Sequence, residues 1–408
     1  MAFDPEELQK RRQQRQEKRK KRQKRTVILL SALALALCAG IVIAVIALLP
    51  NNGTPRPSES TTDTRPPDTV IRLAAVGDLN ITKAVTESGG NTDYTKTFMD
   101  VAHLLADPDI TLVNFEGNLC GAPYGTDRSA PQALANALRS AGVDMVQLAN
   151  SFSIYKGMDG LADTISGIRS AGMEPLGVYA NAADAKAGKG YTIRTVNGIK
   201  IAFVAFTKGM DGMAMPAGNE HCVNVLYKDY ASTYQEVDAE SITAVLSAAA
   251  KEKPDLIVAM LHWGSEFNDT ISNSQTEIRD LLLANGVDAI IGTHSHYVQK
   301  IELDETAGTL TAYSLGDFVG DASRSGTEYS VVLELEIRKD SITGETRVAG
   351  YSYTPIFTVA EEGKPLRVLR IQEAISAYES GYLDRVSQKT YEAMKYALTR
   401  IEARINAE

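Results

Sequence analysis

Five short apolar segments of this chain each end on a residue type that binds metal ions. The polar residues at these ends are Asp78, Glu116, Asn150, His262 and the pair His294/His296. The apolar segments before them have the length and composition of buried strands. In an open α/β sheet, ligands bind where the carboxyl ends of parallel strands meet. We therefore expect an α/β fold with a polar site at one sheet edge.

Predicted strands and helices alternate along most of the chain. The predicted strands are 69–76, 110–114, 143–149, 256–261 and 289–291, and the predicted helices are 94–105, 131–141, 160–171, 241–251 and 275–284. The segment 193–206 predicts a hairpin that turns at Asn197-Gly198. After His296 only strands are predicted, at 298–303, 310–315, 329–337 and 347–353. Alternation followed by a run of strands predicts two layers of sheet with helices outside.

Composition divides the chain into five segments. These are a basic segment (1–26), an apolar segment (27–49), a Pro- and Ser-rich linker without apolar periodicity (50–68), an α/β domain (69–360) and a helical tail (361–408). The linker has the composition of a flexible, disordered tether. The tail carries an apolar stripe, which favours docking on its own domain over docking on a partner.

Segment 27–49 predicts an uncleaved transmembrane helix. Its 23 uncharged residues are enough to cross the hydrocarbon core, which needs about 20. The basic cluster before it predicts a cytoplasmic amino terminus and places the main domain outside the cell. A cleaved signal peptide is the alternative, but its apolar core would be shorter. We expect a single-pass protein of the cell membrane.

Charge argues against nucleic acid as a partner. Residues 1–25 hold 11 basic and 4 acidic side chains and carry a net charge of +7. Because the net charge of the whole chain is −9, the remaining residues carry −16. An acidic body lacks the basic face that nucleic-acid binding requires. The basic run could contact anionic lipid, which its position beside the membrane explains.

The three cysteines form no disulfide framework. Cys38 lies in the apolar segment, and Cys120 and Cys222 could pair in an oxidising compartment. Spacing alone leaves both states of that pair open.

The residue types at the strand ends suit a divalent metal. Carboxylates and imidazoles together bind Mn²⁺, Fe or Zn²⁺. Two ions bridged by a carboxylate could generate a hydroxide and stabilise a displacement. The alternative for any one of these residues is a helix cap or a solvated turn, as for Asp78 or Glu116 alone.

Six motifs in order resemble the CapA-like proteins, the poly-γ-glutamate capsule biosynthesis family related to calcineurin-like metallophosphoesterases. They are Gly77-Asp78, Asn114-Phe115-Glu116-Gly117-Asn118-Leu119, Leu148-Ala149-Asn150, Leu261-His262-Trp263-Gly264, Gly292-Thr293-His294-Ser295-His296 and Tyr313-Ser314-Leu315-Gly316-Asp317-Phe318. The resemblance implies a four-layer α/β/β/α metallophosphoesterase-like sandwich with a two-metal site. It also implies a location on the outer face of a Gram-positive membrane.

The chain departs from the family pattern at one wall of that site. Ser151 and Phe152 stand where the family has Asn and His, and Tyr155 stands where it has Asp. Asp317 replaces a usual Asn, and Ser295 a usual Pro. Phenylalanine offers no ligand atom, so part of the second metal site is missing. Asp317 is a candidate to compensate from another strand.

The resemblance then assigns roles residue by residue. One ion would be held by Asp78, Glu116 and His296, with Asn80, and a second by Glu116, His262 and His294. His262 and His294 are the predicted catalytic residues, and Asn150, Trp263 and Asp317 the predicted substrate-binding residues. One ion is the central expectation, with two ions or none as alternatives.

Three functions follow. The first is a membrane-anchored, extracytoplasmic protein in capsule, poly-γ-glutamate or related cell-surface polymer biosynthesis or processing, by metal-dependent hydrolysis or transfer. Its partners would be the anionic polymer or components of the polymer synthase. The second is a catalytically impaired member that binds polymer or a synthase. The third is a general metallophosphoesterase, which rests on fold analogy alone.

Overall fold

The computed structural model describes residues 65–320, 324–382 and 386–407. The basic segment, the predicted transmembrane helix and all but the end of the linker lie outside these residues. None of the helices within the described ranges has both the length and the apolar character of a membrane span.

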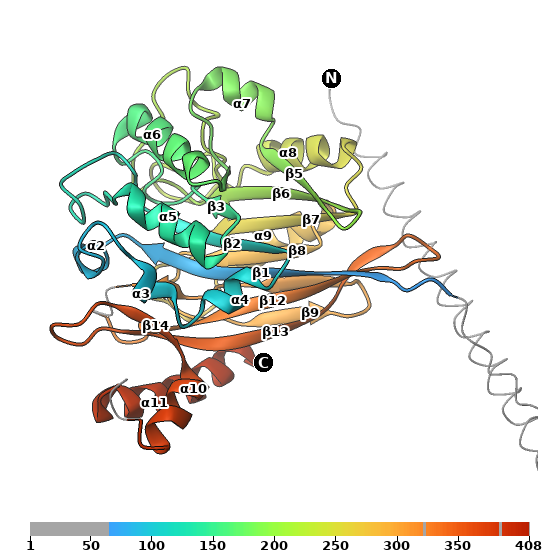
Figure 1. Ribbon diagram of the computed structural model, residues 1–408. Helices are drawn as coiled ribbons and strands as arrows, with labels where there is room; N and C mark the ends of the chain where they lie inside the picture. The colour runs from blue at the N-terminus through green and yellow to red at the C-terminus, as the bar shows by residue number, and fades with distance from the viewer. Residues whose placement is uncertain (1–64, 321–323, 383–385, 408) are drawn as a thin grey trace, which may run out of the picture. The chain divides into compact units, whose positions relative to one another are not determined.

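Two β-sheets form the centre of the folded part (Figure 1). The larger has the order β14-β13-β12-β1-β2-β3-β4, and β11 pairs with β1 off this path. Its strands are β1 (Thr69–Asn80), β2 (Ile110–Glu116), β3 (Met145–Gln147), β4 (Glu174–Leu176), β11 (Asp317–Val319), β12 (Tyr329–Lys339), β13 (Thr346–Val359) and β14 (Arg367–Arg370). Strands β1 to β4 are parallel, whereas β12, β13 and β14 add antiparallel neighbours.

The second sheet has the order β5-β6-β7-β8-β10-β9. Its strands are β5 (Tyr191–Val196), β6 (Ile199–Thr207), β7 (Leu256–His262), β8 (Ala289–Thr293), β9 (Ile301–Asp304) and β10 (Thr309–Ala312). Strands β6, β7 and β8 run parallel. All seven residues of β7 are buried, as a central parallel strand covered on both faces requires.

Helices pack on both sheets. They are α2 (Lys83–Ser88), α3 (Thr95–Phe98), α4 (Ala102–Ala106), α5 (Gln132–Ala141), α6 (Gly157–Ser170), α7 (Ala182–Gly188), α8 (Ala239–Lys251), α9 (Asn273–Ala284), α10 (Ile371–Glu379) and α11 (Gln388–Ile405). Helices α3 to α6 bury their apolar side chains against the larger sheet, and α8 and α9 theirs against the second.

The largest core lies between the two sheets. It joins Leu73 and Leu335 of the larger sheet to Phe203 and Val258 of the second. Helices α10 and α11 complete this core beside β13, so the carboxyl-terminal helices dock on their own domain. The mixed α/β fold is thus as predicted, with helices, sheet, sheet and helices in layers.

Local sequence explains the main elements. Helix α5 begins after Pro131 and ends at Gly142, whose φ of 116° is a left-handed conformation that suits glycine. Helix α9 begins with a capping box formed by Ser272 and Gln275. Asn197 and Gly198 have φ values of 49° and 78°, so the predicted hairpin turn is present between β5 and β6.

Several short elements differ from the sequence expectation. The predicted helix 94–105 is broken into α3 and α4, and Asp100 in the break accepts hydrogen bonds from Arg367. Segment 361–408 contributes the edge strand β14 before its helices. Strands of three or four residues such as β4, β11 and β14 carry too little periodicity to predict. Cys120 and Cys222 are both free thiols, so the pairing alternative is not realised here.

Candidate metal centre

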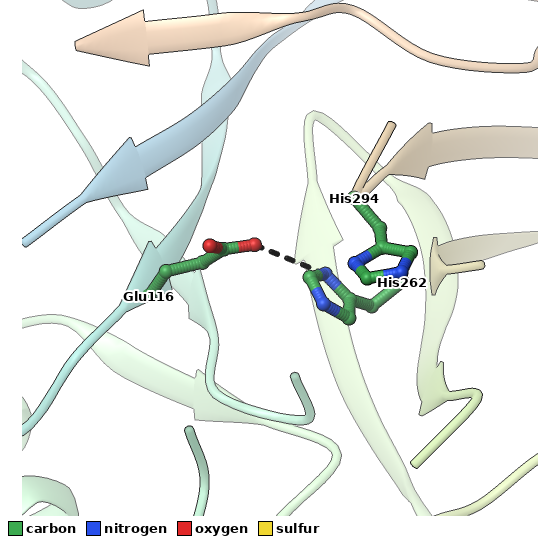
Figure 2. A group of neighbouring side chains, drawn as sticks. All are labelled: Glu116, His262 and His294. Atoms are coloured by element: carbon green, nitrogen blue, oxygen red, sulfur yellow. Dashed lines mark ion pairs between the residues drawn. The ribbon is translucent and has the colours of Figure 1, made fainter. Parts of the chain in front are cut away.

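The carboxyl ends of the central strands bring the predicted ligands to one place. Strands β1 and β2 pair with Asp78 opposite Asn114, and β7 and β8 pair with His262 opposite Thr293. Glu116 at the end of β2 faces His262 and His294 across the gap between the sheets (Figure 2). The candidate ligand side chains are all at most 4% exposed, namely Asp78, Glu116, His262, His294, His296 and Asp317.

The first candidate ligand group consists of Glu116, His262 and His294. One ligand atom from each lies within 4.8 Å of the others. Glu116 Oε1 is 3.4 Å from His262 Nδ1, and the two imidazole centroids are 4.3 Å apart. The buried Nδ1 of His294 has no hydrogen-bond partner among the described residues. A buried unpartnered nitrogen is costly unless an ion or water completes it.

The second group consists of Asp78, His296 and Asp317, again with ligand atoms within 4.8 Å. His296 Nδ1 is 2.7 Å from Asp317 Oδ1 and 3.8 Å from Asp78 Oδ2. Asp317 was predicted to bind substrate. In the structure it faces the same histidine as Asp78, so it is also a candidate metal ligand.

Gly77 allows β11 to bring Asp317 to this position. A Cβ atom at residue 77 would lie 1.8 Å from the carbonyl oxygen of Gly316, so only glycine fits. The N–H of Asp78 donates to that same oxygen at 3.0 Å, which sets Asp78 opposite Asp317 in the register. The glycine before the first strand end is thus a packing requirement of the site.

The loop after β8 holds both histidines in an unusual conformation. His294 has a φ of 87° and His296 a φ of 58°, values that cost free energy for residues with a Cβ. The His294 N–H donates to Asp78 Oδ2 at 2.9 Å. Phe267 stacks on His296 with ring centroids 4.9 Å apart. These contacts explain how the strained loop is held.

Asn114 and Asn150 connect the ligands. Asn114 Nδ2 lies 2.6 Å from Asp78 Oδ1 and 3.3 Å from both Glu116 Oε1 and His262 Nδ1. Asn150 donates to Asn114 Oδ1 at 3.1 Å. The role of Asn114 was not predicted, although it lies two residues before Glu116 and hence on the same face of β2.

The carboxyl groups of the site repel one another in a buried setting. The pKa of Asp78 is raised to about 6, because burial and the Asp317 carboxylate raise it more than His296 lowers it. Burial and the neighbouring Asp78 carboxylate raise the pKa of Glu116 well above its usual value. A bound cation would relieve both effects.

The three imidazoles differ in charge. Burial lowers the pKa of His262 and of His294 well below the usual value, and neighbouring cationic groups add to the effect. Burial also disfavours charge on His296, but the carboxylates of Asp317, Glu116 and Asp78 together outweigh it and raise the pKa of His296 well above normal. Neutral His262 and His294 retain the lone pair that metal ligands need.

Three predicted site residues have other partners. The Asn80 side chain accepts a hydrogen bond from Arg128. Asn150 is 1% exposed and its amide hydrogen-bonds to Asn114, to the Phe115 carbonyl and to the Phe152 N–H. Trp263 is 0% exposed, stacks on Tyr313 and donates its indole N–H to the Tyr313 carbonyl at 2.8 Å. The structure places Trp263 in the core, because it directly follows β7 and packs in the cluster that contains Ile278 and Leu282 of α9.

The altered wall contacts the histidines directly. Ser151 Oγ is 3.0 Å from His262 Nε2. Phe152 is 8% exposed and carries the Arg128 guanidinium on its ring, with 4.3 Å from Cζ to the ring centroid. The donor set therefore fits a divalent metal at Asp78, His296 and Asp317, and a less complete one at Glu116, His262 and His294.

Comparison with known proteins gives consistent matches over the segment that contains the site. The family described as "Bacterial capsule synthesis protein PGA_cap" matches residues 72–322. "Capsule biosynthesis protein CapA" of Bacillus anthracis is 26% identical over 278 residues, which cover 66% of this chain and 64% of that protein. "PGA biosynthesis protein CapA" of Bacillus subtilis strain 168 is 25% identical over 287 residues, covering 69% of this chain and 71% of that protein.

Among solved structures, the calcineurin-like phosphoesterase YfkN from Bacillus subtilis is similar with a TM-score of 0.45 and 16% identity. The alignment covers 81% of this chain and 100% of that one. The chain itself spans about two thirds of the length of the two capsule relatives.

Proposed function

Because the chain belongs to the bacterial capsule synthesis protein family PGA_cap, we propose that it acts in the biosynthesis or processing of poly-γ-glutamate or a related anionic surface polymer. One observation supports a chemical activity in addition to family membership. Three carboxylates and three imidazoles are buried together at the carboxyl ends of strands from both sheets, inside the matched residues. Such a cluster is costly without a compensating ion, so a metal-dependent hydrolysis or transfer is the chemistry we propose.

The cellular location is part of the proposal. The uncharged segment 27–49 follows a basic cluster, which supports a single-pass anchor with the amino terminus in the cytoplasm. The α/β domain would then face the outside of the cell membrane. There it would meet the growing polymer and the membrane components of its synthase.

A divalent ion such as Mn²⁺, Fe²⁺ or Zn²⁺ would supply Lewis acidity and an activated water. Asp78, His296 and Asp317 would hold one ion, and Glu116, His262 and His294 offer a second set. Neighbouring side chains hold these ligands in position. Asn114 holds Asp78 by a hydrogen bond of 2.6 Å, and Phe267 covers one face of His296 and limits access of water to it.

Metal analysis of the purified full-length protein tests the proposal. We expect wild-type protein to retain metal, and His262→Ala and His296→Ala to lose it together with polymer processing. His103→Ala is the matched control, because His103 is an exposed histidine on α4. A metal-free wild type whose polymer handling survives both substitutions would eliminate a metal-dependent enzyme.

A second candidate function is a catalytically impaired member that binds the polymer or a synthase component. The contact between Ser151 and His262 favours it, because a weak ligand then stands where the family has Asn. Turnover of a peptide or phosphoester substrate by metal-loaded wild type would reject this alternative. Polymer binding without any turnover would support it.

A further inference from the structure

Arg128 lies at the edge of the candidate metal centre on a loop that is held in a strained conformation. Asp127 and Arg128 have φ values of 51° and 57°, both in the left-handed region that residues with a Cβ avoid. Lys156 pairs with Asp127 at 2.7 Å, and Asn118 N–H donates to the Arg128 carbonyl at 2.8 Å. Strain of this kind persists where surrounding contacts impose it, and it often marks functional sites.

One nitrogen of the guanidinium fixes its position next to Glu116. Arg128 Nη1 donates to the Asn80 side chain and, at 3.3 Å, to the carbonyl of Ile81. Asn80 is opposite Glu116 in the pairing of β1 with β2. Arg128 therefore lies beside the group of Glu116, His262 and His294. It also hydrogen-bonds to the side chain of Asn80, which was predicted to bind metal.

The other edge of the guanidinium is uncommitted. Within the described part of the chain, no group accepts a hydrogen bond from Arg128 Nε or Nη2. The Arg128 residue is only partly buried. A guanidinium edge with two parallel donors matches a carboxylate in a bidentate pair.

Phe152 supplies the platform for this arginine. The Arg128 Cζ lies 4.3 Å from the Phe152 ring centroid, and Tyr155 meets the same ring edge-on at 5.8 Å. Tyr155 is 38% exposed. The Phe152 ring therefore supports the guanidinium, and the exposed Tyr155 ring offers apolar surface near it, against which methylene groups can pack.

We propose that Arg128, Phe152 and Tyr155 form a subsite that binds a side-chain carboxylate of an acidic polyamide next to the metal centre. Arg128 binds the carboxylate through Nε and Nη2 while Phe152 supports the guanidinium, and the exposed Tyr155 ring contacts the adjoining methylene groups. The substitutions at 152 and 155 thus turn a ligand wall into a recognition surface. This inference rests on the proposed function, because it names the part of the polymer that the site would bind.

A carboxylate fits this subsite better than a phosphate. The free edge offers two donors in one plane, which match the two oxygens of a planar carboxylate. Phosphate sites normally combine several donors around three oxygens, whereas the free donors here lie beside the Phe152 and Tyr155 rings. Phosphate binding is therefore the competing outcome.

The test measures binding of a fluorescent penta-γ-glutamate peptide to the purified full-length protein. We expect saturable binding to wild type, no binding of a penta-glutamine peptide, and at least about tenfold weaker binding to Arg128→Gln. Arg128→Lys keeps the charge but loses the bidentate edge, so it should fall in between. Arg194→Gln is the matched control. Arg194 lies on β5 opposite Ile201, near the amino-terminal ends of β6 and β7, whereas the metal centre lies at the carboxyl ends.

Each outcome decides the inference. Equal binding by Arg128→Gln and wild type, or no binding by wild type, overturns it. Displacement of the peptide by inorganic phosphate but not by glutarate overturns the choice of carboxylate. Thermal melting of Arg128→Lys, expected to match wild type, separates lost recognition from lost folding.

Polymer production in cells distinguishes the inference from the function on which it rests. Normal surface polymer in cells that lack the protein would refute the proposed function, while Arg128-dependent peptide binding would still support the subsite. Reduced polymer with Arg128-independent binding would refute only the subsite.

Discussion

Ser151 Oγ and His262 Nε2 lie 3.0 Å apart, and this contact links the altered wall of the site to its most buried histidine. The other nitrogen of His262 lies 3.3 Å from Asn114 Nδ2 and 3.4 Å from Glu116 Oε1. Both imidazole nitrogens therefore have polar neighbours. A metal at this group must replace one of these contacts, and Ser151 and Phe152 supply fewer ligand atoms than the family pattern, so we expect weaker metal binding here than at Asp78, His296 and Asp317.

Restoring the family residues should strengthen the group of Glu116, His262 and His294. We expect Ser151→Asn combined with Phe152→His to raise the bound metal from about one to about two ions per chain, because both new side chains offer ligand atoms. Elemental analysis by mass spectrometry after gel filtration measures the ratio. Phe152→Leu is the control, since it removes the ring without adding a ligand. An unchanged ratio in the double variant would show that the backbone at 151 does not place these side chains toward the metal.

Asp317 should matter more for metal binding than Asn80. Asp317 Oδ1 lies 2.7 Å from His296 Nδ1, whereas Asn80 is engaged by Arg128. We expect Asp317→Asn to weaken metal affinity roughly 10–100-fold, as loss of a ligand or of a histidine-orienting carboxylate does. Asn80→Ala should change it less than about threefold. Isothermal titration with Mn²⁺ and Zn²⁺ gives both affinities, and the reverse order would contradict this ligand assignment.

Trp263 should act in stability alone. We expect Trp263→Phe to lower the free energy of unfolding by about 1–3 kcal/mol, because the buried Tyr313 carbonyl loses its donor. Metal affinity should remain unchanged. Urea unfolding measures the first quantity and titration the second. Tyr396→Phe, an exposed aromatic on α11, is the matched control and should stay within about 0.5 kcal/mol of wild type. A large loss of bound metal in Trp263→Phe would contradict this prediction and indicate that Trp263 is part of the site.

Glu361 should make stability depend on pH at the acid end. The hydrogen bond with Lys364, followed by those from Ser387 N–H and Thr390, lowers the pKa of Glu361 to about 2. The contacts to Ser387 and Thr390 tie the carboxylate to the start of α11. Because the folded-state pKa lies below the unfolded one, the contribution is present above pH of about 4.5 and disappears as the pH falls toward 2.

Urea unfolding at pH 7 and at pH 3 tests this. Glu361→Gln should be less stable than wild type at pH 7 by about 1–2 kcal/mol, and the difference should shrink at pH 3. Glu362→Gln, at the exposed neighbouring position, should match wild type at both values. A difference that is equal at the two pH values would refute a role for the ionised carboxylate.

Much of the architecture could be predicted from periodicity. Alternation of strands and helices predicted the mixed α/β fold, and the ordered motifs indicated the CapA-like family that the comparisons confirm. The broken helix at 94–105 and the short strand β14 could not be predicted, because distant partners decide them. Arg367 binds Asp100 in that break although 267 residues separate the two in the chain.

The sequence by itself determined which side chains stand at the strand ends, since the period of a strand and the glycines after it are local properties. Asp78, Glu116, His262 and His294 needed no tertiary information to be singled out. Only the tertiary structure decided what each of them faces. Gly77 lets β11 bring Asp317 to His296, Asn80 is taken by Arg128, and Trp263 turns into the core. The physical reason is that partners in a buried polar cluster are set by the register and packing of distant strands, which spacing along the chain does not encode.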